Sequence, residues 1–163
     1  MKLLGILLIV IVVALFVGCT AKSIIEPVVK KTHEVVQLAE ATVQQANMTN
    51  YVSTAKSLVA PLQLVEKALT FVDGKLPDGE VKAVVTEVTV ALSAVIVIIE
   101  NLNEDTVDDL KYQIVKGIGA VGTAVEKLAA VLDIDLNTIS KSMHTNAVEE
   151  LDRATKELEA LLK

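Results

Sequence analysis

The sequence is poor in the residue types on which most catalytic and metal sites depend. It has no Trp, one Cys and two His, and aromatic residues make up only 2% of its 163 residues. A single Cys excludes an internal disulfide in any compartment. His33 and His144 have no Cys, His or paired carboxylate at ligand spacing, so neither a metal site nor a nucleophile–base pair is indicated. We expect a non-enzymatic protein without a cofactor, with both histidines on solvated helix surfaces.

The charge of the chain excludes a second class of partner. Its formal net charge is −6, which repels nucleic-acid phosphates and anionic lipid head groups alike. The few aromatic side chains leave no stacking platform for bases, so we expect no nucleic-acid partner. What the chain does have is apolar residues, at 52% with a mean hydropathy of +0.54. That content is enough to bury a core and excludes extensive disorder.

The longest apolar run lies at the start of the chain. Lys2 supplies a minimal positive segment, and an unbroken run of 15 apolar residues follows from Leu3 to Val17. This length suits the apolar region of a signal peptide, whereas a membrane-crossing helix needs roughly 20 residues. Gly18 and Cys19, the lone cysteine, follow the run directly.

The segment Phe16-Val17-Gly18-Cys19 resembles the bacterial lipobox, in which apolar and small residues precede an obligatory Cys. The resemblance implies a lipoprotein precursor: the Cys19 thiol receives a diacylglyceryl group, the Gly18–Cys19 bond is cleaved, and the new amino terminus can be acylated. Phe16 departs from the commonest pattern, which has Leu there. Two or three acyl chains anchor a protein firmly at a membrane. Thr20, where Asp usually signals inner-membrane retention, favours a periplasm-facing location at the outer membrane of a Gram-negative host.

The alternative interpretation is an uncleaved signal anchor. Residues 3–21 form a stretch of 19 residues before Lys22, just enough to span a bilayer. In the lipoprotein interpretation the chain divides into a signal peptide (1–18), a lipidated tether (19–26) and a helical domain (27–163). An extended tether from Cys19 to Ile25 would reach about 24 Å and hold the domain near the membrane.

The remaining sequence predicts an all-α fold, an antiparallel bundle of four to five helices after the N-terminal signal helix. Apolar residues recur at helical spacing over 23–47, 51–72, 80–101, 103–132 and 137–162. Pro27 suits a first helical turn, Pro61 predicts a kink, and residues 73–79 predict a turn. The segment 90–99 is apolar on nearly all sides, and we expect a buried core helix rather than a second span because Glu87 and Glu100 accompany it.

Gly117, Gly119 and Gly122 form the spacing GxGxxG, which is typical of dinucleotide-binding loops. That motif needs a preceding strand, for which 112–115 is the only candidate, and a second strand ending in an acid about 20 residues later. The helical sequence that follows does not supply the second strand. We instead expect a helix face that packs closely against a neighbour, or a hinge, since three interior glycines cost a helix roughly 2–3 kcal/mol.

Asp133-x-Asp135-x-Asn137 imitates the start of a calcium loop. Thr138 stands where such a loop needs Gly, and His144 where it needs a bidentate Glu. These acids are therefore interpreted as helix-capping residues.

The sequence favours a membrane-tethered lipoprotein with a structural or interaction role in the cell envelope. Its partner would be an envelope protein or another copy of the chain. Two alternatives stay open: a carrier or sensor of an apolar ligand such as lipid within the bundle, and an exclusion or immunity lipoprotein encoded by a mobile element.

Overall fold

A computed structural model describes residues 2–136 and 146–163, with side chains from Lys22 onward. The described residues contain helices and no strand, which confirms the predicted all-α bundle. In chain order the elements are α1 (Lys2–Gln45), the 3₁₀ helix η1 (Met48–Asn50), α2 (Tyr51–Ser57), α3 (Val59–Asp73), α4 (Glu80–Glu100), α5 (Val107–Val131) and α6 (Ala147–Leu161).

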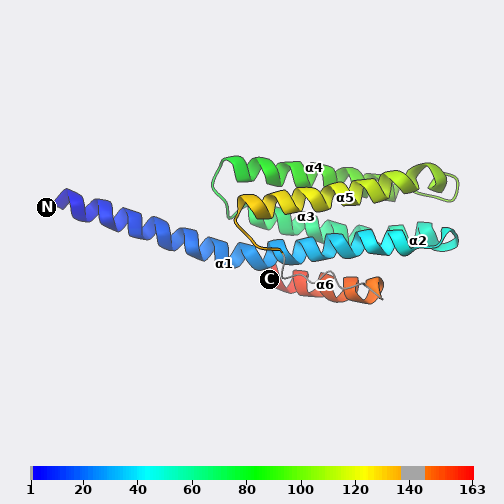
Figure 1. Ribbon diagram of the computed structural model, residues 1–163, viewed down its shortest axis with the longest axis horizontal. Helices are drawn as coiled ribbons and strands as arrows, with labels where there is room; N and C mark the ends of the chain where they lie inside the picture. The colour runs from blue at the N-terminus through cyan, green and yellow to red at the C-terminus, as the bar shows by residue number, and fades with distance from the viewer. Residues whose placement is uncertain (1, 137–145) are drawn as a thin grey trace.

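The core of the fold is a bundle of four helices, formed by the second half of α1 with α3, α4 and α5. Each of these helices packs against the next, and α5 closes the ring by packing against α1. Neighbours run antiparallel (Figure 1), the up-and-down arrangement that short connections favour. Helix α6 lies outside this ring, packs against α1 and α3, and runs antiparallel to α1.

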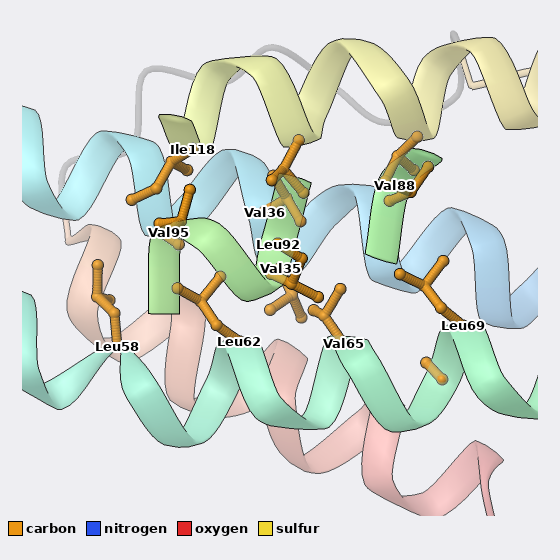
Figure 2. Close-up of a cluster of buried hydrophobic side chains, with 14 of the residues drawn as sticks. Val35, Val36, Leu58, Leu62, Val65, Leu69, Val88, Leu92, Val95 and Ile118 are labelled. Atoms are coloured by element: carbon orange, nitrogen blue, oxygen red, sulfur yellow. The ribbon is translucent and has the colours of Figure 1, made fainter. Parts of the chain in front are cut away.

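The interior of the bundle is built largely from valine and leucine. Figure 2 shows side chains from all four helices meeting at its centre, among them Val35, Val36, Leu62, Val65, Leu69, Val88, Leu92, Val95 and Ile118. Valine has only modest helix propensity, so the helices depend on this burial rather than on intrinsic preference. Each fully buried side chain of this size contributes about 1.5–3 kcal/mol.

Helix α1 is much longer than the sequence predicts. It begins at Lys2 rather than near Ser23 and includes Pro27 in its interior, so the expectation of Pro27 in a first turn is wrong. Buried neighbours on either side, Ile25 and Val28, fix this part of the helix against the bundle and compensate for the missing backbone donor. The extended tether is also corrected. A helix advances 1.5 Å per residue, so Cys19 to Ile25 covers roughly 10 Å.

The second predicted helix is interrupted, as Pro61 implies. Helix α2 ends at Ser57, α3 begins at Val59, and the fully buried Leu58 lies between them. Pro61 has no N–H to donate to the carbonyl of Ser57, four residues earlier. At the interruption the Leu58 N–H donates to the Ala55 carbonyl, and the Leu58 carbonyl accepts a hydrogen bond from the Leu62 N–H, both at 3.0 Å. The interruption therefore lies one turn before the proline.

Candidate functional site

The lipobox-like segment lies on the part of α1 that projects beyond the bundle. The backbone of residues 16–19 is helical, and the same helix enters the bundle without interruption. Three residues after Cys19, the Lys22 ammonium donates a hydrogen bond of 2.9 Å to the Asp133 carbonyl and lies 3.5 Å from its carboxylate. The predicted attachment residue is therefore less than one helical turn from a contact with the turn that ends α5.

Asp133 holds that position because it ends α5. Its φ of 54° is left-handed, and the Ile134 N–H reaches back to the Ala129 carbonyl at 2.8 Å. This is the Schellman arrangement that terminates many helices. The Asp133 carboxylate pairs with Lys22, and no group of three His, Cys, Asp or Glu residues in the described part of the chain is placed to hold a metal. Asn137, Thr138 and His144 lie outside the described residues.

The end of the bundle at which α1 leaves is called the proximal end here; it comprises residues 22–27, 129–134 and 160–163, together with the connection between α3 and α4 at residues 73–80 (Figure 1). Exposed apolar side chains from three helices lie there: Ile24 (47% exposed), Val131 (36%) and Leu161 (40%). A groove of about 540 Å³ separates α1 from α6, and Pro27, Ala160 and Leu161 supply its apolar lining.

An ion pair holds α6 against α1 at this groove. Lys31 donates to Glu157 of α6 and to Glu34 of α1, each at 2.5 Å. Burial alone would lower the pKa of Lys31, but the hydrogen bonds to the two carboxylates raise it above its ordinary value. The hydrogen bond from Lys31 in turn lowers the pKa of Glu157. Both shifts favour the charged pair at neutral pH.

The three glycines lie inside α5, which passes through them without a break. A Cβ added to Gly117 would lie 2.5 Å from Val95 Cγ2, so this glycine permits the close approach of α4. Gly119 and Gly122 face α1, at Glu40 and Val36. Residues 112–115 are helical, which removes the strand that a dinucleotide-binding loop requires. The structure shows close packing at Gly117 and a continuous helix through all three glycines.

His33 is not on a solvated surface, and that prediction is wrong. Its side chain is buried, with Nε2 3.3 Å from Glu126 Oε1 of α5, and among the residues that the structure describes Nδ1 has no hydrogen-bond partner. Helix α1 packs against α3, α5 and α6, so it buries a wider face than a helix with one packing side. His144, predicted to be similar, lies outside the described residues.

Helix α4 is less enclosed than its sequence indicates. Its inner face is buried, but Val90 and Val97 on the opposite face are 65% and 54% exposed. Among the helical segments whose side chains the structure describes, from Lys22 onward, α4 alone has the length and apolar composition of a membrane span, with 39% of that window buried in the bundle. A core helix has the same composition, and α4 packs against both α3 and α5.

No family model, curated protein or solved structure matches this chain. Its function is therefore inferred from its own residues and geometry.

Proposed function

We propose that this protein is a lipid-anchored bacterial envelope protein with a non-enzymatic, structural or interaction role. The observation that carries the proposal is the segment Phe16-Val17-Gly18-Cys19, placed directly at the end of a 15-residue apolar run. The only cysteine of the chain stands where the lipobox requires its acceptor. The acidic charge and the shortage of aromatic residues agree with a protein that binds neither nucleic acid nor anionic ligands.

The geometry of α1 supports a spacer or docking role at a fixed height. Lys22 contacts Asp133 three residues after Cys19, a helical rise of about 4.5 Å, so no flexible linker separates the anchor from the bundle. Helix α5 runs back along the bundle for 25 residues, or about 37 Å. The acid-rich turn at residues 103–109 therefore lies at the end farthest from the anchor, where an envelope partner or a second copy would meet it.

The proposal is tested by expressing the full chain in bacteria beside Cys19→Ala and the control Thr20→Ala. Cells are fed an alkyne fatty acid and then fractionated. We expect label in wild type and in the control, and neither label nor cleavage in Cys19→Ala. An unlabelled wild type, together with a Cys19→Ala protein that stays equally membrane-bound, would establish the uncleaved signal anchor instead.

An apolar ligand is the second candidate, and the grooves beside α6 favour it. One, of about 540 Å³, lies against α1, and the other, of about 520 Å³, lies against α3 between Phe71 and Leu162. Both volumes lie in the range of small-molecule sites. Native mass spectrometry of the purified protein distinguishes this function: a copurified lipid supports it, whereas a bare protein that also binds no apolar dye rejects it.

A further inference from the structure

We propose that the proximal end of the bundle rests on the lipid bilayer, with Ile24, Val131 and Leu161 inserted among the head groups. This inference rests on the proposed anchoring through α1 and adds the orientation of the bundle and the surface that touches lipid. The bundle would stand end-on, with its helices projecting away from the membrane and the α4 face directed sideways.

The three apolar side chains belong to helices that are joined at this end. The hydrogen bond from Lys22 to Asp133 joins α1 to the end of α5. Lys22 is two positions before Ile24, and Asp133 is two positions after Val131, so the bond brings these two apolar residues to the same end of the bundle. Pro27 and Leu161 line one groove, which places the end of α6 beside the same part of α1. The three exposed side chains therefore lie around the point at which α1 leaves the bundle.

The distances bring this end to the depth of the lipid head groups. Acyl chains on Cys19 must lie in the hydrocarbon core, and Ile24 is five residues further along the helix, a rise of about 7.5 Å. The interfacial layer on each side of a bilayer is roughly 5–8 Å thick. Apolar side chains of surface-bound helices enter it to a similar depth. With Cys19 at the edge of the hydrocarbon core, Ile24 therefore falls at the depth of the head-group layer.

The charges at the proximal end fit a zwitterionic lipid surface. Lys22 pairs with Asp133, and Lys163 lies 3.4 Å from Glu159. In the connection between α3 and α4, Asp78 pairs with Lys82 at 2.7 Å, and Asp73 and Glu80 add two further acids, so acids match or outnumber the cations at this end. With a net charge of −6 the whole chain would be repelled by anionic lipid. Apolar contact, rather than electrostatic attraction, accounts for the binding, and the long lysine stems can extend toward the head groups.

The absence of Trp from the chain permits a direct test. Single-Trp variants Ile24→Trp, Val131→Trp and Leu161→Trp are compared with Val97→Trp and Tyr112→Trp, which are also at exposed apolar positions but away from this end. Each full-length protein, with its native anchor, is purified and reconstituted in phosphatidylcholine vesicles whose acyl chains carry bromine. We expect blue-shifted emission and loss of most of the intensity at the three proximal positions, with water-like, unquenched emission at the two controls.

The outcomes separate this inference from the proposed anchoring. Unquenched tryptophans at all three proximal positions would overturn it, as would quenching at Val97 without quenching at Leu161, which indicates a bundle lying on its side. Blue-shifted proximal emission that bromine leaves unquenched, in a dimeric protein, would assign this end to a second copy instead. The mass of the same purified protein reports on Cys19 independently. An unacylated Cys19 with quenched proximal tryptophans refutes the lipid anchor and retains the docking surface.

Discussion

The side chain of Lys22 donates a hydrogen bond of 2.9 Å to the backbone carbonyl of Asp133, 111 positions later in the sequence. This bond joins the point where α1 enters the bundle to the point where α5 ends. It depends on the left-handed backbone of Asp133, because that conformation turns the chain out of α5. The stability of the proximal end is therefore sensitive to which residue occupies position 133.

The Asp133 backbone predicts a difference between two substitutions. Both Asp133→Gly and Asp133→Ala remove the carboxylate that lies 3.5 Å from Lys22 Nζ, but only glycine adopts φ near 54° without a steric cost. We expect Asp133→Ala to be less stable than Asp133→Gly by about 1 kcal/mol, measured by urea unfolding. Equal stabilities would show that the left-handed turn is absent in solution.

The contact between Gly117 and Val95 predicts the opposite behaviour of two neighbouring glycines. Gly117→Ala would place a methyl group 2.5 Å from Val95 Cγ2, and we expect a loss of about 1–3 kcal/mol from overpacking. Gly119→Ala meets only the flexible Glu40 side chain at 3.4 Å, so the helix gains up to about 1 kcal/mol from the better propensity of alanine.

A double variant provides the control for this pair. Val95→Ala removes the methyl group that the new side chain meets, so Gly117→Ala should cost much less free energy in that background than in wild type. Thermal unfolding of the four proteins in the cycle measures the coupling. Additive effects would place the cost of Gly117→Ala somewhere other than the contact between α4 and α5.

The sequence predicts the elements of this fold better than their ends and surroundings. The boundaries of α4 agree to within one residue because local signals define them, namely the turn at residues 73–79 and Asn101. Pro61 likewise predicts the interruption at Leu58. The length of α1 was missed because a signal segment and a domain helix are recognised by different patterns, and neither pattern reports whether they join.

The contacts of the candidate site depend on tertiary register, which periodicity does not contain. Cys19 is evident from its motif alone, but its closeness to Asp133 requires α1 and α5 to pack antiparallel at one particular offset. The burial of His33 was missed for a related reason. Helical periodicity indicates that one face is buried, whereas the number of neighbours around α1 decides how wide that face is.

The ion pair between Lys31 and Glu157 predicts a pH-dependent attachment of α6. Lys31 lowers the pKa of Glu157 in the folded protein below its ordinary value of 4.5. The pair therefore stabilises the fold fully at a pH above 4.5, and this stabilisation is lost as the pH falls through the lowered pKa. The pKa of Lys31 is raised in the folded protein above its ordinary value of 10.5. Its contribution to stability is therefore fully present at a pH below 10.5 and is lost as the pH rises through the raised pKa.

The measurement is the difference in unfolding free energy between wild type and Glu157→Gln as a function of pH. We expect about 0.2–1 kcal/mol at neutral pH, since Glu157 is half exposed, and no difference in strong acid. Asp152→Asn is the matched control, because its pair with Lys156 lies within α6 and does not reach α1. A wild-type advantage over Glu157→Gln that is the same at every pH would show that the ion pair is not its source.

The buried ring of His33 predicts a variant that is more stable than the natural protein. Its Nδ1 has no hydrogen-bond partner within residues 22–136 and 146–163, and an unsatisfied buried polar atom costs about 1–3 kcal/mol. Leucine fills a similar volume without that atom, so we expect His33→Leu to raise the free energy of unfolding by about 1 kcal/mol. Glu126→Ala is the control for the lost Nε2 contact of 3.3 Å, and its effect should be small because that carboxylate is 58% exposed. A less stable His33→Leu protein beside an unchanged Glu126→Ala protein would mean that Nδ1 is satisfied in solution.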